Sequence, residues 1–249
     1  MNKKTFLSNS LAAPRETGVY QKLVLFDVDG TLITGTVEHE KAFSDAFRTV
    51  YGVNTNISII NHLGMTDQEV IIKVLKKNGL AESEIKPKIG ECMDVMVKSF
   101  QKLIKESSFK PLRGAGKLLR ELSERDVLMG LATGNLEEIA RGKLRKLRLN
   151  DYFKVGGFGS DDIHRANLIR LAIKRAEKKF NFKPDNNIFL FGDTPRDINA
   201  AKEAGVKAIG VTTKIYSKED LLKCDPDYIL EDLSNTDEIL TIIFPKAAG

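Results

Sequence analysis

One stretch near the N-terminus, K-L-V-L-F-D-V-D-G-T from Lys22 to Thr31, constrains the fold more than any other part of the sequence. Four apolar residues, Leu23 to Phe26, run without interruption into Asp27, a pattern typical of a strand buried on both faces of a parallel sheet. Asp27 and Asp29 are two residues apart, so on an extended chain they face the same side. Two carboxylates in one pocket repel each other unless a cation or a shared proton relieves them. The stretch therefore predicts a metal-assisted site with a carboxylate nucleophile at a strand tip.

Composition limits the classes of protein that this chain can be. Its 249 residues, 42% hydrophobic and 29% charged, suit an ordinary globular protein with one large α/β domain or a core with a smaller inserted domain. No apolar run approaches the roughly 20 residues that span a bilayer. The net charge of +5 comes from basic residues interleaved with acidic ones, without an arginine-rich arm. We therefore expect no membrane partner and no nucleic-acid partner. Cys92 and Cys224 are far apart in the sequence, so we expect a cytoplasmic protein without disulfides.

After the first strand the chain shows helical spacing only. Apolar residues recur with helical periodicity over 38–50, 66–79 and 82–105, and no convincing strand lies between Ile60 and Phe109. We therefore expect an all-helical segment inserted directly after the first strand.

From Pro111 onward, strands and helices alternate. Apolar strands are expected at 127–132, 153–155, 187–191, 207–211 and 227–230, and a helical segment precedes or follows each of them. The run G-G-F-G-S-D-D after Val155 is interpreted as a plain loop. Repeated β-then-α units favour an α/β fold with a doubly wound parallel sheet. The sequence thus predicts an N-terminal tail (1–20), an α/β catalytic core (21–34 and 111–249) and an all-helical cap (35–110).

Polar signatures follow three of the predicted strands. They are Asp27-x-Asp29, T-G-N at 133–135, and G-D-T-P-R-D at 192–197. The carboxyl ends of parallel strands converge at one sheet edge, and one helical turn returns Asp197 to the side of Asp193. These carboxylates suit a hard cation such as Mg²⁺. Thr133, at a strand end before a helix start, can offer a hydroxyl and backbone N–H groups to a phosphate.

These three motifs, in this order, resemble those of the haloacid dehalogenase-like hydrolases. The first is D-V-D-G-T, the second is L-A-T-G-N and the last is G-D-T-P-R-D. Together with the helical insertion after the first motif, they resemble the helical-cap phosphatases of the phosphoglycolate-phosphatase-like branch. The resemblance covers most of the chain and implies a Rossmann-like core and phosphatase chemistry.

The resemblance implies a role for each motif residue. Asp27 would attack phosphorus and form an aspartyl-phosphate, while Asp29 would protonate the leaving alcohol and then deprotonate the attacking water. Mg²⁺ would be held by Asp27, the backbone carbonyl of Asp29 and Asp193, with Asp197 acting directly or through water. The phosphoryl oxygens would be bound by the second motif, namely Thr133, Gly134 and Asn135. Haloalkanoate dehalogenases lack the second aspartate, so Asp29 argues against a dehalogenase.

The family's basic motif is where this sequence departs from the common pattern. Most members have a lysine near the start of the helix before the last motif, and this chain reads F-G-S-D-D-I-H-R-A-N-L there. Arg165 is best placed to neutralise Asp27 and phosphate, because its planar fork suits two oxygens. His164 and Lys174 are weaker candidates, and we expect Lys174 at the surface.

Within the cap, the candidate substrate-facing residues are His39, Gly64, Met65 and Thr66. The competing interpretations are structural: a lone histidine such as His39 or His62 is more often at the surface or in the core, and Thr66 can simply start a helix. A run of basic residues after the second motif is interpreted as a solvated helix face, namely Arg141, Lys143, Arg145, Lys146 and Arg148.

The functional hypothesis is Mg²⁺-dependent hydrolysis of a small phosphate monoester, phosphoglycolate-like or a sugar phosphate. A phosphomutase of the same fold and a non-catalytic phosphate-binding or regulatory protein remain the alternatives. Intact carboxylates at Asp27, Asp29 and Asp193 count against the second of these. The expected partner is a small phosphorylated metabolite, bound to a monomer or a homodimer.

Overall fold

A computed structural model describes residues 20–185, 187–212 and 215–245 of the chain. Its centre is one sheet of six parallel strands in the order β3-β2-β1-β4-β5-β6. The strands are β1 (Lys22–Phe26), β2 (Val127–Thr133), β3 (Val155–Phe158), β4 (Ile188–Gly192), β5 (Lys207–Val211) and β6 (Tyr228–Leu230). Strand β1 pairs with β2 on one side and with β4 on the other, so it lies at the topological switch point of the sheet.

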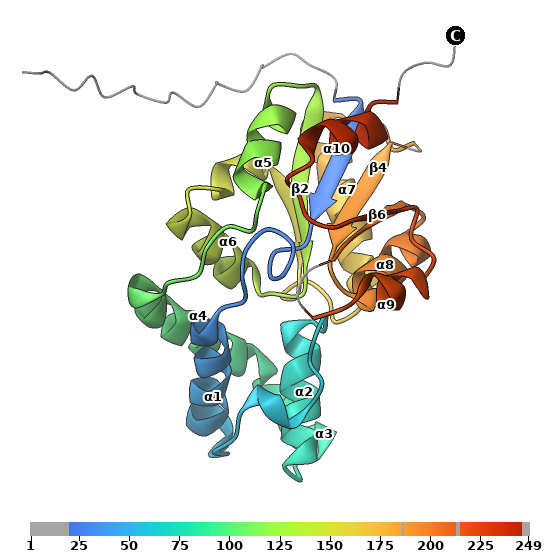
Figure 1. Cartoon of the computed structure of the whole chain (residues 1–249). Helices are drawn as coiled ribbons and strands as arrows, with labels where there is room; N and C mark the ends of the chain where they lie inside the picture. Colours follow the sequence, from blue (N-terminus) through green and yellow to red (C-terminus); the bar gives the residue numbers. More distant parts are fainter. Residues whose placement is uncertain (1–19, 186, 213–214, 246–249) are drawn as a thin grey trace, which may run out of the picture.

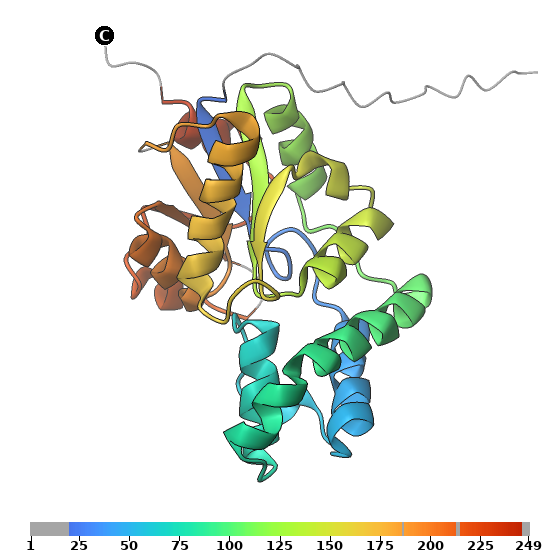
Figure 2. The same cartoon turned by 180° about the vertical axis from the view of Figure 1, so that it is seen from behind.

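The sheet is covered on both faces, as the unbroken apolar run of β1 predicts. Val24 and Phe26 pack into one core layer, whereas Leu23 and Leu25 pack into the other. Helices α5 (Ala115–Ser123), α6 (Glu137–Lys146) and α10 (Thr236–Ile243) cover the first layer. Helices α7 (Arg165–Phe180), α8 (Pro195–Ala204) and α9 (Lys218–Leu222) cover the second (Figure 2). The predicted doubly wound α/β fold is confirmed.

The helices between β1 and Pro111 gather beyond the carboxyl end of the sheet (Figure 1). They are α1 (Val37–Tyr51), α2 (Asp67–Lys77), α3 (Glu82–Ile85) and α4 (Ile89–Leu103). Their apolar faces form a separate core that includes Phe43, Phe47 and Met96. The arrow of β1 points toward these helices in Figure 1, so the residues after β1 face them. We refer to this helical group as the cap.

Two chain segments connect the cap to the sheet and pair with each other. The N–H of Thr34 donates to the carbonyl of Lys110 at 2.9 Å, and the N–H of Leu112 donates to the carbonyl of Leu32 at 2.9 Å. This pairing lies where the sequence places the junction between core and cap. The boundaries 21–34, 35–110 and 111–249 remain predictions. The predicted tail (1–20) lies, apart from Tyr20, outside the described residues.

The prediction of a loop after Val155 is wrong for residues 156–158, whereas residues 159–161 do form a turn. Strand β3 runs from Val155 through Gly156 and Gly157 to Phe158 and pairs with β2. A Cβ on Gly157 would lie 1.9 Å from the carbonyl oxygen of Leu168, so the absence of a side chain lets α7 pack directly on the strand. Glycine within a strand allows close approach of a neighbouring backbone. Because a glycine-rich run lacks the apolar pattern of a buried strand, the sequence alone did not predict this one.

The described helices were compared with the requirements of a membrane span. None of those within residues 20–185, 187–212 and 215–245 combines the length and the apolar character needed to cross a bilayer.

Candidate active site

The site is built around the end of the central strand. Asp27 follows β1 directly, and its backbone N–H donates to the carbonyl of Phe191 at 2.9 Å. Gly30 then adopts φ = 83°, a conformation that glycine takes without strain. A Cβ on Gly30 would lie 2.1 Å from a carboxylate oxygen of Asp193, so the turn also leaves room for that side chain. The glycine of the first motif therefore lets Asp193 lie next to Asp27.

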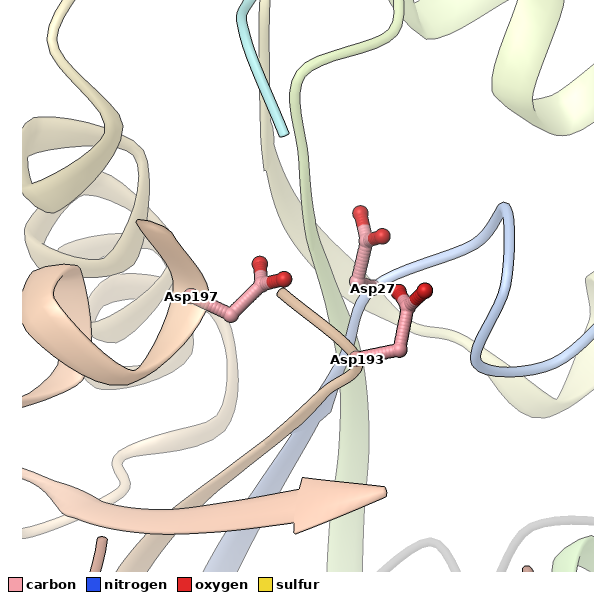
Figure 3. A group of neighbouring side chains, drawn as sticks. All are labelled: Asp27, Asp193 and Asp197. Carbon is pink, nitrogen blue, oxygen red and sulfur yellow. The ribbon is translucent and has the colours of Figure 1, made fainter. Parts of the chain in front are cut away.

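Three buried carboxylates converge at this edge of the sheet. Asp27, Asp193 and Asp197 each offer an oxygen within 4.8 Å of the others, and they are 6%, 3% and 1% exposed. They come from the end of β1, the loop after β4 and the first turn of α8, and Figure 3 shows the three groups around one space. A compact set of hard oxygen donors is the kind of site that divalent cations such as Mg²⁺ occupy. The structure therefore provides a candidate metal centre.

Asp197 also caps its own helix. Its Oδ2 accepts hydrogen bonds from the N–H of Thr194 at 3.0 Å and from the Thr194 hydroxyl at 2.7 Å. In return the N–H of Asp197 donates to the Thr194 hydroxyl at 3.3 Å, which completes a capping box. Because Oδ2 is engaged in this way, only Oδ1 of Asp197 is left to face the cluster.

Arg165, the first residue of α7, lies against this cluster. Its Nη2 is 2.9 Å from Oδ1 of Asp27 and also contacts Oδ1 of Asp197, and its Nη1 donates to the carbonyl of Gly64 at 3.2 Å. The side chain is 11% exposed. Of the three basic candidates, Arg165 alone makes these contacts, because His164 has a 64% exposed side chain and Lys174 is exposed.

The pKa of Asp27 lies above its ordinary value, at about 6. Burial raises it most, because a charged carboxylate is poorly solvated there, and the charges of Asp197 and Asp29 raise it further. The Arg165 guanidinium and a hydrogen bond from Thr133 oppose this rise without cancelling it. Arg165 therefore does not offset burial and the neighbouring carboxylates at Asp27, and a further positive charge beside Asp27 would lower its pKa.

Asp29 faces a different environment, and its main partner is a residue that the sequence interpretation misplaces. The interpretation puts Lys143 on a solvated basic face, yet this residue is fully buried on α6. Its Nζ lies 2.5 Å from Oδ2 of Asp29, 2.6 Å from Oδ1 of Asn135 and 3.1 Å from Nδ1 of His39. The interpretation is wrong for Lys143 because a buried lysine is stable when acceptors surround it, and these acceptors come from distant parts of the chain.

The position of Lys143 on its helix is a signal that could have identified it. Lys143 is four residues after Ile139 and three after Ala140, so it lies on the apolar face of α6. The remaining basic residues of the run agree better with the prediction of a solvated face. Arg145, Lys146 and Arg148 are exposed or partly exposed, and Arg141 is half-buried beside Glu137.

The pKa of Asp29 lies below its ordinary value. Burial would raise it, but the positive charge of Lys143, the neighbouring His39, the hydrogen bond from Lys143 and the nearby Asn135 together lower it more. Two aspartates separated by Val28 therefore have pKa values shifted in opposite directions.

The cap closes on the second motif through Asp67, the first residue of α2. Its backbone N–H donates to the carbonyl of Gly134 at 2.8 Å, and its Oδ2 accepts from the N–H of Leu136 at 2.8 Å. The same oxygen is 3.1 Å from Nε2 of His39 on α1. Thr66 caps α2 and donates to the carbonyl of Ile163 at 3.0 Å. Cap and core are thus joined by direct hydrogen bonds beside the carboxylates.

A cavity of about 250 Å³ lies between the sheet edge and the cap. Nine of the predicted site residues line it, namely Asp27, Asp29, His39, Gly64, Met65, Gly134, Asn135, Arg165 and Asp193. Thr133, Thr66 and Asp197 are buried beside it, and the Thr133 hydroxyl accepts a hydrogen bond from the Asn135 side chain at 3.3 Å. The cavity brings together residues from both ends of the chain and from the cap.

The sequence matches the family described as haloacid dehalogenase-like hydrolases over residues 24–211. The chain belongs to this family. The match begins inside β1 and ends with β5, so it includes every element that supplies a carboxylate to the cluster.

Relatives of this haloacid dehalogenase-like hydrolase span almost its whole length. It is 24% identical to the pyrophosphatase PpaX of Anoxybacillus flavithermus, over 88% of this chain and 96% of the relative. It is 22% identical to the phosphoglycolate phosphatase of Vibrio vulnificus, over 89% and 96%. Among solved structures, CbbY from Rhodobacter sphaeroides in complex with phosphate superposes with a TM-score of 0.67 at 19% identity, covering 86% of this chain and 96% of that one. The prediction that the protein is an enzyme of this hydrolase family is confirmed.

Among the residues that lie at the cavity or contact its lining, Lys143 and Thr36 had no site role in the sequence interpretation. Thr36 lines the cavity, and its hydroxyl has no hydrogen-bond partner among the described residues. Asp67 belongs to the segment 64–67 that resembles a substrate-facing cap loop, but its hydrogen bonds to the second motif were not predicted. Nothing in the spacing around Thr36 or Asp67 distinguishes them from ordinary helix-start residues.

Proposed function

We propose that this protein is a Mg²⁺-dependent phosphatase that hydrolyses a small phosphate monoester through an aspartyl-phosphate on Asp27. One observation carries the proposal most directly: Asp27 sits at the tip of β1, in a small cavity, between a guanidinium and two further buried carboxylates. A nucleophilic carboxylate, a fixed cation and a set of metal ligands are the parts that phosphoryl transfer needs.

The donor set fits a magnesium ion. Asp27, Asp193 and Asp197 present hard oxygen atoms, and a divalent cation beside them would lower the pKa of Asp27, which burial and the charges of Asp197 and Asp29 raise. Asp27 and Asp193 would hold the ion with the backbone carbonyl of Asp29, and Asp197 would act through water because Thr194 and Arg165 engage its oxygens. When bound, the ion would neutralise charge that develops on the transferring phosphoryl group.

The remaining residues can be given separate tasks in two steps. In the first, an oxygen of Asp27 attacks phosphorus, the bond to the leaving oxygen breaks, and Asp29 gives that oxygen its proton. In the second, Asp29 takes a proton from water, the water oxygen attacks phosphorus, and the bond to Asp27 breaks. Arg165 and Asn135 would bind the phosphoryl oxygens, and the Nε of Arg165, which is buried with no partner among the described residues, is available for one of them.

The size of the cavity favours a small substrate. About 250 Å³ between the sheet and the cap accommodates a phosphoryl group and a few further heavy atoms. A phosphoglycolate-like molecule or a sugar phosphate fits this limit. Relatives named phosphoglycolate phosphatase and pyrophosphatase support testing phosphoglycolate first and inorganic pyrophosphate beside it.

A phosphate-release screen tests the function. Purified protein is incubated with phosphoglycolate, sugar phosphates, nucleoside monophosphates, pyrophosphate and p-nitrophenyl phosphate, each with Mg²⁺ and with a chelator. We expect release from at least one small ester, only with Mg²⁺. A protein that releases no phosphate from any of them would contradict the proposal, and an isomerised sugar phosphate without net release would indicate a phosphomutase.

A further inference from the structure

We propose that Lys143 is a positioning residue that orients the Asp29 carboxylate for proton exchange with the substrate. The inference rests on the proposed function, because it assigns a task to Asp29 in that reaction. It concerns a residue outside the sequence motifs, on the helix that follows the second of them.

The first argument is the arrangement of atoms around the Lys143 ammonium. The side chain is fully buried, and Nζ lies 2.5 Å from Oδ2 of Asp29, 2.6 Å from Oδ1 of Asn135 and 3.1 Å from Nδ1 of His39. An ammonium group has three N–H donors and accepts nothing, so these three partners use all of its hydrogen bonds. Its position is therefore fixed from three directions, and it fixes the carboxylate of Asp29 in turn.

The second argument is the tautomer that this arrangement requires of His39. Because Nδ1 faces an ammonium donor, it accepts, and the ring proton then lies on Nε2. Nε2 is 3.1 Å from Oδ2 of Asp67, which is an acceptor, so each donor in the chain from Lys143 to Asp67 meets an acceptor. A buried polar network in which every member is satisfied holds its side chains in one arrangement. This network includes residues of both the core and the cap.

The third argument is the difference between the two oxygens of Asp29. Oδ2 is occupied by Lys143, whereas Oδ1 is buried and has no hydrogen-bond partner among the described residues. Asp29 lines the cavity in which the substrate would lie. Because the lysine holds Oδ2, the carboxylate keeps one orientation at the cavity wall. Without the lysine, the carboxylate would be free to rotate, and the productive orientation would be one of several.

The test separates positioning of a proton donor from a general loss of structure. We compare Lys143→Met, which keeps the apolar stem and removes the ammonium, with the wild-type protein on p-nitrophenyl phosphate and on the alkyl phosphate turned over fastest in the screen. The ratio kcat/KM reports the steps up to departure of the leaving group, and p-nitrophenolate leaves without help from an acid, whereas an alkoxide does not. We expect kcat/KM to fall at least about 10-fold more for the alkyl ester than for the aryl ester.

The control is Arg145→Met. Arg145 is a basic residue on the same helix with a 53% exposed side chain, and this variant should keep the wild-type kcat/KM on both substrates. Equal losses on the two esters, or no loss on either, would overturn the positioning role of Lys143 while the wild-type phosphatase remains established. If wild-type protein releases phosphate from neither ester, the proposed function fails and the inference fails with it. Thermal unfolding of both variants measures how much stability each substitution removes.

Discussion

The two halves of the cavity differ in how their charges are balanced. In the carboxylate half, Asp27 and Asp197 share one guanidinium, that of Arg165, beside the third carboxylate, Asp193. In the lysine half, Asp29 faces one fully buried ammonium that Asn135 and His39 also contact. Asp27 therefore shares its cation with another carboxylate, whereas within the described residues Asp29 does not share Lys143 with a second carboxylate.

This difference explains why neighbouring aspartates behave differently. Burial acts on both, yet the pKa of Asp27 rises to about 6 whereas that of Asp29 falls, because only Asp29 has a lysine to itself. A divalent cation in the carboxylate half would lower the pKa of Asp27 and keep its carboxylate ionised for attack on phosphorus. A phosphoryl dianion bound beside Asp29 would raise the pKa of Asp29 toward that of a useful acid. The carboxylate half is thus suited to a divalent cation, and the lysine half is suited to a phosphoryl dianion.

The largest effect is expected from replacing Asp27, the proposed nucleophile in the carboxylate half. Asp27→Asn should lower kcat by at least about 10⁴-fold, because an amide neither attacks phosphorus nor leaves it. The measurement is steady-state phosphate release with Mg²⁺, with circular dichroism to show that the fold is kept. Glu124→Gln, at an exposed carboxylate far from the cavity lining, is the matched control and should retain full activity. Substantial turnover by Asp27→Asn would refute the nucleophile assignment.

Removing the cation should have the next largest effect and acts on the carboxylate half alone. Excess EDTA should reduce phosphate release to background, and added Mg²⁺ should restore it, because the clustered carboxylates would repel an incoming phosphate without a bound cation. Ca²⁺ at equal concentration serves as a control for nonspecific charge screening. Full activity in EDTA would show that Arg165 suffices and that the cluster is not a metal centre.

Arg165 is the fixed cation of the same half, and its loss should have a smaller effect. Arg165→Ala should lower kcat/KM by about 10²–10³-fold, since it removes a charge that touches Asp27 and would touch the phosphoryl group. Lys174→Ala on the same helix should change kcat/KM less than about 2-fold, because Lys174 is exposed. The reverse order of effects would transfer the basic-motif role from Arg165 to Lys174.

The smallest effect is expected on the stability of the fold, and it tests the raised pKa of Asp27 that distinguishes it from Asp29. Because the folded protein raises the pKa of Asp27 to about 6, the stability that protonated Asp27 contributes is present at low pH and is lost as the pH rises through 6. In EDTA, Asp27→Asn should therefore unfold a few degrees above the wild-type protein at pH 8, and by a smaller margin at pH 5. Differential scanning calorimetry at the two pH values measures both margins, and equal margins would contradict the raised pKa.

Local pattern was sufficient to predict much of the fold and the positions of several candidate site residues. The apolar run before Asp27 predicted a central strand buried on both faces, and β1 has this environment. The spacing around Asp193 and Asp197 predicted a strand tip followed by one helical turn, as β4 and α8 show. The position of Arg165 at the start of a helix favoured it as the basic residue, and it contacts Asp27. Strand ends and helix starts are local features, so the sequence around each one carries the information.

Tertiary structure alone decided where the buried lysine and the cap contacts lie. Lys143 is one of five basic residues on a short helical stretch, and its burial depends on Asp29, which is 114 residues away. Asp67 contacts Leu136 across 69 residues. Charge and spacing determined that one strand tip carries two carboxylates. Which of the two carboxylates has a cation to itself depends on long-range packing, because the cost of burying a charge is set by neighbours that are distant in the chain.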